Sequence, residues 1–234
     1  MKKLYRNIIL VLVLLLSLFL VGCGEQPSLK NPYDQANYTL TSTFNFSKEL
    51  TLDEAKQALA EAASYFATAK SYSYTQTITG EYDSQYSYQG ITKIDVSGST
   101  PKASIELTGT TEYALYIADN KAYMNYNGYK TYFDFKTDLS DLIDKAQQSF
   151  GAFTSFDEAN LTQESLILCG IDDSETTVIK FKYDAETTVM VAINEGKIMK
   201  VLYANDDSIE YTSNYDYNAV TVTLPSDLDS YVEK

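Results

Sequence analysis

The strongest constraint on the fold is an alternation of large and polar side chains between residues 71 and 89. The even-numbered positions carry Tyr72, Tyr74, Gln76, Ile78, Gly80, Tyr82, Ser84, Tyr86 and Tyr88. Every odd-numbered position of the same stretch is polar. Successive side chains of a β-strand point to opposite faces, so a period of two predicts strands with one face against a core and one near water. Tyrosine, with 21 copies in the chain, suits such sheets because its apolar ring ends in a polar hydroxyl.

The same pattern continues along most of the chain, with turn residues between the runs. Asp119-Asn120 and Asn127-Gly128 are predicted hairpin turns, because Asn and Gly tolerate a positive φ. The further predicted strands span residues 103–108, 113–117, 122–126, 129–135, 163–169, 176–183, 187–193, 197–204, 208–217 and 219–224. The result is a sheet of about ten or eleven antiparallel strands, which should curl strongly because long twisted sheets do not stay flat.

Two helices interrupt the strands. Thr51 and Glu54 have the spacing of a capping box, in which a hydroxyl and a carboxylate satisfy free backbone groups at the start of a helix. Apolar residues then recur at helical spacing, which predicts a helix over 52–69 whose narrow, alanine-rich stripe can lie against a sheet. A second helix is predicted over 138–150. The predicted fold class is therefore α+β, mainly β.

The first 22 residues have the features of a bacterial signal peptide. Three basic residues precede an apolar run over 8–21, which is too short to span a bilayer core of ~30 Å comfortably. Leu20-Val21-Gly22 and then Cys23 follow, which resembles a lipobox, where the cysteine receives a diacylglycerol and the chain is cut before it. We expect residues 1–22 to be a lipoprotein signal peptide. The alternative is an ordinary signal peptide whose cysteine is incidental.

The lipobox also predicts the organisation of the rest of the chain. Residues 23–50 are polar at first and contain Pro27 and Pro32, so we expect a tether that lifts the protein off the membrane. Near its end, the alternation over residues 40–46 is typical of a short first strand. Residues 51–234 are expected to form one ligand-binding domain. The diacylglycerol at Cys23 is the only covalent group expected, and no other cofactor is.

Composition excludes several classes of function. The chain has no His, so it cannot carry a Ser-His-Asp or Cys-His arrangement or a His-ligated zinc site. Its net charge of −14 becomes more negative once the signal peptide is removed, and such a surface repels nucleic acid. Cys169 lies in an apolar run and is expected to be a buried, inert thiol. The pairs Asp172-Asp173 and Asp206-Asp207 lack the spacing of a calcium loop. We expect no metal, no nucleic acid and no catalysis.

The order of these elements resembles the LolA-like superfamily of lipoprotein carriers and lipid-holding surface lipoproteins. After the lipobox, the resemblance rests on residues 53–59 in the helix, 69–74 at the first strand, 101–104, the hairpin 118–123 and the last strand 222–225. It covers about residues 50–228. The small lipoproteins of Gram-positive bacteria in that superfamily are the most similar.

The resemblance implies a curled antiparallel half-barrel closed by two helices, whose concave side holds a lipid or another apolar molecule. It implies a protein anchored to the outer face of the cell membrane of a Gram-positive bacterium, and we expect a monomer. We expect helix 52–69 and the hairpin at Asn127-Gly128 to close a cavity of several hundred Å³. The expected lining residues are Tyr72, Tyr74, Tyr82, Tyr113, Leu115, Ile117, Tyr123, Met124 and Tyr126.

Two alternatives remain at this point. Each tyrosine could pack in the core under helix 52–69 instead of contacting a ligand. The whole protein could instead be a sensory or structural lipoprotein that binds a protein or a cell-wall glycan through its tyrosine-rich surface. A dry cavity would favour the carrier, and a filled interior with exposed aromatic side chains would favour the second function.

Overall fold

The computed structural model describes residues 39–80, 88–108, 112–145, 161–204, 209–218 and 220–234. Cys23, the predicted signal peptide, Tyr82 and Asp206-Asp207 lie outside these residues. The second half of the predicted helix 138–150 does so as well.

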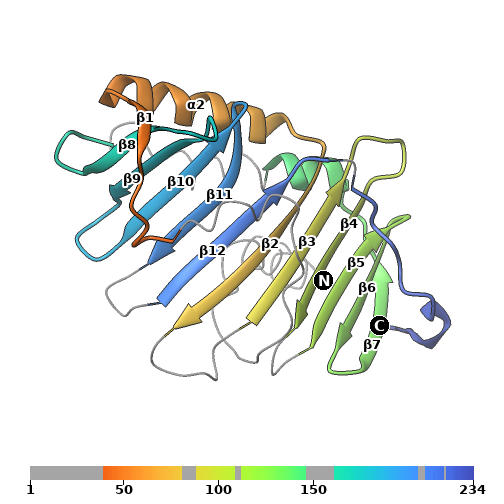
Figure 1. The fold of residues 1–234 in the computed structure, drawn as a ribbon. Coiled ribbons are helices and arrows are strands. Elements are labelled where there is room, and N and C mark those ends of the chain that lie inside the picture. Colours follow the sequence, from red (N-terminus) through yellow and green to blue (C-terminus); the bar gives the residue numbers. More distant parts are fainter. Residues whose placement is uncertain (1–38, 81–87, 109–111, 146–160, 205–208, 219) are drawn as a thin grey trace.

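The described chain forms one curled, mainly β sheet of 13 strands with helices at one end (Figure 1). The order across the sheet is β1-β8-β9-β10-β11-β12-β2-β3-β4-β5-β6-β7-β13. The strands are β1 Phe46–Glu49, β2 Ser71–Gly80, β3 Tyr88–Asp95, β4 Lys102–Thr108, β5 Tyr113–Ala118, β6 Lys121–Tyr126, β7 Tyr129–Asp134, β8 Leu166–Asp172, β9 Thr177–Lys182, β10 Thr188–Asn194, β11 Lys197–Ala204, β12 Ile209–Asp216 and β13 Val232–Glu233. Neighbours are antiparallel except β7 and β13, which are parallel. The predicted class is confirmed, with more strands than the expected ten or eleven.

The differences from the predicted strands lie mostly near the ends of the chain. β1 pairs with β8, so part of the segment expected as a tether is a strand of the sheet. Residues 220–224 form no strand, although Val220 and Val222 alternate with polar residues. The Val220 N–H donates instead to the Ser71 hydroxyl, 3.3 Å away, and the described strands of the sheet do not pair with this segment. The short strand β13 follows further along the chain.

Helix α2 spans Leu52–Thr68 and starts as predicted. The Thr51 hydroxyl accepts from the Glu54 N–H at 3.3 Å, and the Glu54 carboxylate accepts from the Thr51 N–H at 2.8 Å. These two bonds satisfy backbone groups that a helix start leaves free. The buried stripe is Ala55, Leu59, Ala62 and Phe66, and it packs over β8, β10 and β11. Small alanine side chains let the helix lie close to the strands.

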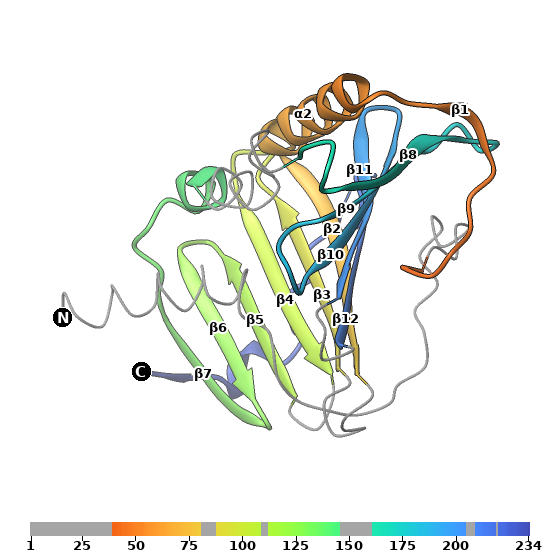
Figure 2. The same cartoon turned by 90° about the vertical axis from the view of Figure 1, so that its left-hand side faces the viewer.

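A second helical segment over 139–145 begins where the sequence predicts. Figures 1 and 2 show both helices at the same end of the strands. We call the sheet face on which they lie the inner face. On the outer face of β9, β10 and β11, Val178, Met190 and Leu202 are covered by Leu40 and flanking residues of the N-terminal segment. Lys180 Nζ also donates to the Leu40 carbonyl. This half of the sheet is therefore buried on both faces.

The hairpin turns adopt the backbone that their residues favour. Asn127 and Gly128 have φ values of 47° and 83°, and Asp119 and Asn120 have 51° and 59°. Consecutive positive φ angles make the tight turn that matches the twist of paired strands. The Asn127-Gly128 hairpin, however, lies at the end of the strands away from α2 in both views (Figures 1 and 2). The expectation that this hairpin and α2 close one mouth together is therefore wrong, because the strands between them run the full length of the sheet.

Candidate functional site

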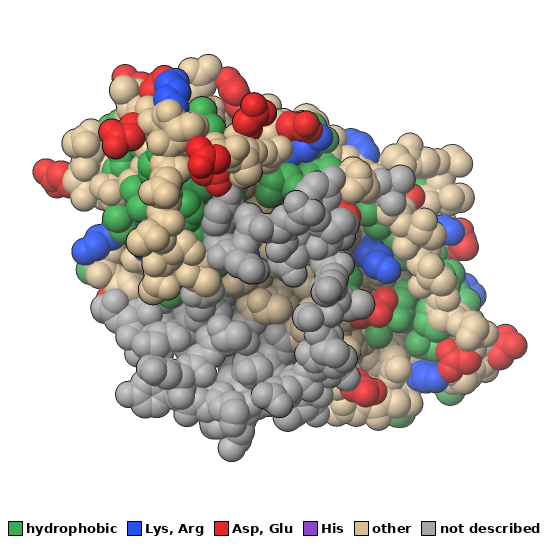
Figure 3. Space-filling model, viewed as in Figure 1, with side chains coloured by type: hydrophobic (Ala, Val, Ile, Leu, Met, Phe, Trp, Pro, Cys, Tyr) green, Lys and Arg blue, Asp and Glu red, His purple; other side chains and the backbone are tan. Residues whose placement is uncertain are grey.

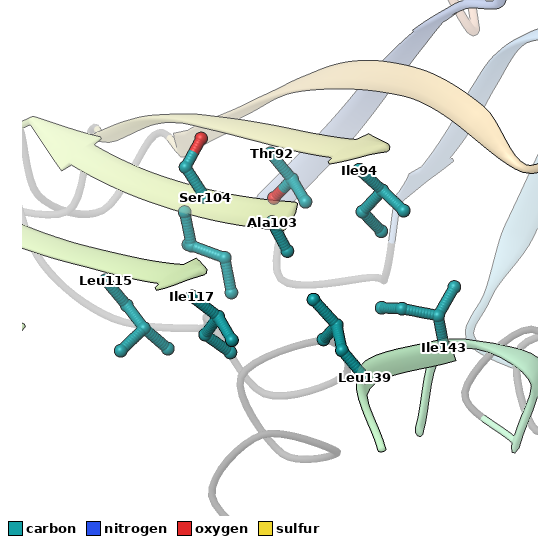
Figure 4. Close-up of a pocket in the computed structure, with 9 residues that line it drawn as sticks. Thr92, Ile94, Ala103, Ser104, Leu115, Ile117, Leu139 and Ile143 are labelled. Carbon is teal, nitrogen blue, oxygen red and sulfur yellow. The ribbon is translucent and has the colours of Figure 1, made fainter. Parts of the chain in front are cut away.

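The inner face of β3, β4 and β5 is closed by the segment 139–145, which leaves a small apolar cavity (Figure 4). Its lining residues are Thr92, Ile94, Ala103, Ser104, Ile105, Leu115, Ile117, Leu139 and Ile143. Leu139 and Ile143 project from the helical segment toward the strands. The volume is about 10 Å³, which holds roughly one water molecule. Ligand pockets usually measure about 300–1,000 Å³, so the expected acyl-chain cavity is not formed at this place.

Beyond the helical segment the inner face continues across β5, β6 and β7 in three successive rungs. The strand register places Ile117 opposite Ala122, Leu115 opposite Met124, and Tyr113 opposite Tyr126. On β7 the matching positions are Phe133, Thr131 and Tyr129. Residues directly opposite in a sheet share a face. The structure therefore brings five of the expected lining residues onto one face: Tyr113, Leu115, Ile117, Met124 and Tyr126.

Exposure along these rungs rises with distance from the helices. Leu115 and Ile117 are buried, with 4% and 3% of their surface exposed. Tyr126 and Tyr129, next to the Asn127-Gly128 turn, are 51% and 67% exposed. We call the rung formed by Tyr113, Tyr126 and Tyr129 the open end of the inner face. It is aromatic and uncharged, and burial raises the pKa of the Tyr113 hydroxyl to about 12.

Tyr72 and Tyr74 lie on the inner face but belong to the core beneath α2. The Tyr72 ring meets Phe66 edge-on with centroids 5.2 Å apart, and the Tyr74 ring lies 5.5 Å from Tyr215. Burial raises the pKa of Tyr74 to about 12, although a hydrogen bond with Thr92 opposes this shift. Aromatic pairs at such distances stabilise a core. For these two residues the alternative of core packing holds, and they offer no surface to a ligand.

Tyr123 lies on the outer face and does not join the other expected residues. Its register partners are Tyr116 and Tyr132, and its ring meets Tyr231 edge-on with centroids 5.7 Å apart. Tyr231 comes from the C-terminal segment, which therefore packs against the outer face here. The period of two explains the error: Tyr123 and Met124 are adjacent, so they must point to opposite faces.

Thr131 is a residue of this face that the sequence does not single out. It occupies the middle rung beside Met124, and only 2% of its surface is exposed. Its hydroxyl oxygen is buried and has no hydrogen-bond partner. Threonine is common in strands, so only its register position and its missing partner make it notable.

Two features of the described residues concern metal binding and thiol chemistry. No group of three or more His, Cys, Asp or Glu side chains gathers among them. Cys169 is buried and its thiol donates to the Leu50 carbonyl, 3.0 Å away. Burial is the main cause that raises the pKa of this thiol, which keeps it in its unreactive form. Negative charge gathers instead on the surface around α2 and β1 (Figure 3). Within the described part of the chain, no helix has the length and apolar character needed to cross a membrane.

Comparison with known proteins finds likeness in structure alone. No family model and no curated protein matches the sequence. A crystal structure of LprF from Mycobacterium bovis is 10% identical, covers 77% of this chain and 99% of that chain, and has a TM-score of 0.45. The LolA superfamily protein NE2245 from Nitrosomonas europaea is 12% identical, with 74% and 96% covered and a TM-score of 0.32.

A third similar structure is the MucA/MucB complex of Pseudomonas aeruginosa. It is 10% identical, covers 72% of this chain and 59% of that chain, and has a TM-score of 0.38. The superfamily that the sequence resembles is thus represented among the similar solved structures. At TM-scores below 0.5 this likeness carries no inference about function, which has to come from the residues of this chain.

Proposed function

We propose that this protein is a membrane-anchored extracytoplasmic lipoprotein that binds a hydrophobic or amphipathic ligand, such as the acyl chain of a lipid, without catalysing a reaction. The observation that carries the proposal is the gradient on the inner face of β5–β7. Its residues change from buried aliphatic side chains under the helical segment to exposed tyrosines at the open end. Such a face offers apolar contact to a chain and an amphipathic rim to a headgroup.

The small cavity defines what binding requires. An acyl chain that buries a few hundred Å² gains roughly 25 cal/mol for each Å² of apolar surface removed from water. The cavity of about 10 Å³ admits no such chain as it stands. The ligand therefore lies along the open end, or it displaces Leu139 and Ile143 from the strands. In the described part of the segment, Leu139 and Ile143 are the two side chains that line the cavity, so moving them would open it toward the strands.

The anchor completes the proposal. A diacylglycerol on Cys23 would hold the chain at the outer face of the membrane. The negative charge around α2 and β1 would keep that end of the sheet away from anionic headgroups. The open end lies on the other half of the sheet, where it stays accessible to a ligand in the same compartment.

A second function is favoured by the same small cavity. A nearly filled interior with Tyr126 and Tyr129 exposed also suits a lipoprotein that binds a protein or a cell-wall glycan. Tyrosine rings stack on flat apolar surfaces and their hydroxyls form hydrogen bonds, so they serve either partner.

Two measurements distinguish these functions. Native mass spectrometry of the protein purified from its own host should show a bound lipid. The chain from residue 23 onward, made with Cys23→Ser, should bind a fluorescent fatty acid saturably. Tyr126→Ser and Tyr129→Ser should each weaken that binding about threefold or more, because each removes apolar contact at the open end. Tyr183→Ser removes an equally exposed tyrosine (49%) from the other half of the sheet and should leave binding unchanged. Absence of bound lipid and of saturable binding would reject the carrier function in favour of the second.

A further inference from the structure

The hydroxyl of Thr131 is a buried polar group without a partner on an otherwise apolar face. Thr131 is 2% exposed, and its Oγ1 accepts and donates no hydrogen bond within the protein. A buried hydroxyl without a partner has lost its hydrogen bonds to water and gained none in return, which destabilises the fold. Proteins seldom keep such a group in a core unless a ligand, a water or a reaction uses it.

The position of Thr131 relates it to the proposed ligand. Its register partner is Met124, whose own partner is Leu115, a residue that lines the cavity under the helical segment. Thr131 thus lies one rung deeper than the tyrosines of the open end and one rung short of Phe133. A ligand with its chain under the helices and its headgroup among the tyrosines would place the junction of the two beside Thr131.

The charges around Thr131 restrict what that junction can be. The described inner-face residues of β5, β6 and β7 are uncharged, and Lys121 and Lys130 project from the outer face. On that face Lys121 lies over the Tyr132 ring, and Lys130 is paired with Asp227. Among the described residues of these three strands, a carboxylate or an ammonium beside Thr131 would find no counter-charge on its own face, and an unpaired buried charge is costly. An ester carbonyl is neutral and only accepts hydrogen bonds, so a single hydroxyl donor satisfies it.

We infer that Thr131 recognises the ester carbonyl of a neutral acyl lipid, to which its hydroxyl donates a hydrogen bond. This inference rests on the proposed function, because it assigns the polar contact of the same ligand. It makes Thr131 a specificity-determining residue: it selects an acyl ester over an ether or a free fatty acid of equal chain length. It also fixes the direction of the ligand, with the chain toward the helices and the headgroup toward Tyr126 and Tyr129.

The test compares two lipids that differ only in the carbonyl. A 1-monoacylglycerol and the 1-alkylglycerol of equal length compete with the fluorescent fatty acid for the Cys23→Ser chain. The Cys23→Ser chain, which keeps Thr131, should bind the ester about threefold to tenfold more tightly than the ether. This is the range expected for one net hydrogen bond. Thr131→Val keeps the shape of the side chain and removes the hydroxyl, so it should bring the two affinities together.

Stability provides the second readout. Because the Thr131 hydroxyl has no partner, Thr131→Val should melt at the same temperature as the parent chain or higher. The matched control is Thr176→Val. Thr176 is also buried, but its hydroxyl contacts Ser174 and Asn194 at 3.1 and 3.3 Å in the turn between β8 and β9. This control should melt at a lower temperature and should keep the preference for the ester.

The outcomes separate this inference from the function on which it rests. If neither glycerol lipid displaces the probe and no lipid binds, the proposed function fails. If both lipids bind equally well to the parent chain, or if Thr131→Val keeps the preference for the ester, the lipid site stands and the role of Thr131 is overturned. If an ordered water satisfies the hydroxyl, Thr131→Val should keep the preference for the ester and should also melt at a lower temperature than the parent chain.

Discussion

The rings of Tyr74 and Tyr215 face each other across the junction of β2 and β12, with centroids 5.5 Å apart. This is the place where the strands of the first and last thirds of the chain meet. Each hydroxyl has a partner: that of Tyr74 bonds with Thr92, and that of Tyr215 with Ser213. The nearby Tyr217, whose ring lies 6.5 Å from Tyr215, has a buried hydroxyl without one.

The hydroxyls of Tyr215 and Tyr217 predict opposite effects of the same Tyr→Phe substitution. Tyr215→Phe should lower the free energy of unfolding by about 1 kcal/mol, because it removes a buried hydrogen bond. Tyr217→Phe should leave it unchanged or raise it by about 1 kcal/mol, because the hydroxyl that it removes is desolvated and unpaired. Urea unfolding of the two variants measures the difference. Equal losses in both would contradict the assignment of partners.

Alkaline pH should destabilise the protein through the same cluster. Burial raises the pKa of Tyr74 from 10.0 to about 12 and that of Tyr215 well above 10.0. A folded pKa above the unfolded one means that the unfolded chain loses its proton first as the pH rises. The contribution of these tyrosines to the free energy of unfolding is therefore fully present below about pH 10. It is lost between about pH 10 and about pH 12. Unfolding titrations across this interval, followed by tyrosinate absorbance, should show ionisation together with unfolding. A stability that stays flat through the interval would contradict the burial of these hydroxyls.

Acid pH should weaken the start of α2. The pKa of the Glu54 carboxyl is lowered from 4.5 to about 2, first by its hydrogen bond with Lys48 and then by those with Thr51. Because this pKa is lower in the folded protein than in the unfolded chain, the ionised Glu54 carboxylate stabilises the fold above about pH 4.5. This stabilisation is lost as the pH falls toward about 2. Glu54→Gln should therefore melt below the parent chain at neutral pH and coincide with it near pH 2. Glu61→Gln makes the same charge change later in α2 and provides the control for net charge.

Cys23→Ser should prevent lipidation, because Cys23 is the acceptor that the lipobox predicts. The variant should be released from the membrane or remain unprocessed, because serine offers no thiol for the diacylglycerol. Metabolic labelling with an alkyne fatty acid, followed by fractionation, measures both effects. Equal labelling of the two proteins would show that Cys23 is incidental.

Enlarging the inner cavity should improve binding while it weakens the fold. Leu139→Ala removes a buried side chain that closes the cavity, so it should cost about 2–4 kcal/mol of stability. The same change should raise the affinity for an apolar probe. Leu202→Ala makes an equal truncation on the outer face, under Leu40, and should destabilise without raising affinity. Titration of the fluorescent fatty acid and thermal unfolding check both variants, and equal affinities for the two would contradict binding at the inner face.

The sequence predicts the elements of this fold better than it predicts the site. The alternation over 71–80, the capping box at Thr51 and the turn at Asn127-Gly128 are local signals, and the structure confirms each of them. The pairing of β2 with β12 joins segments that are far apart in the sequence, so no local pattern of residues predicts it. That pairing, together with the position of α2, decides that Tyr72 and Tyr74 belong to the core.

The candidate face could be predicted only in part for a similar reason. Tyr113, Leu115 and Ile117 share one parity within a single strand, so their common face follows from the sequence. Which parity of β6 joins them depends on the register set by the turn at Asp119-Asn120. That register puts Met124 on the inner face and Tyr123 on the outer one. Thr131 could not be found in advance, because a missing hydrogen-bond partner is visible only in three dimensions.

The pairing of β2 with β12 and the seat of α2 on β11 also set the order in which the molecule can assemble. Strands β2 to β7 are successive neighbours, so they can pair early, since contacts close in sequence form fastest. Helix α2 precedes all of them but has to wait for strands near the other end of the chain. A chain that ends before Lys197 would lack β11, so the part of α2 that packs on this strand would stay uncovered. The seat of α2 on the sheet is thus complete only once β11 is present, although α2 itself is the first helix of the described chain.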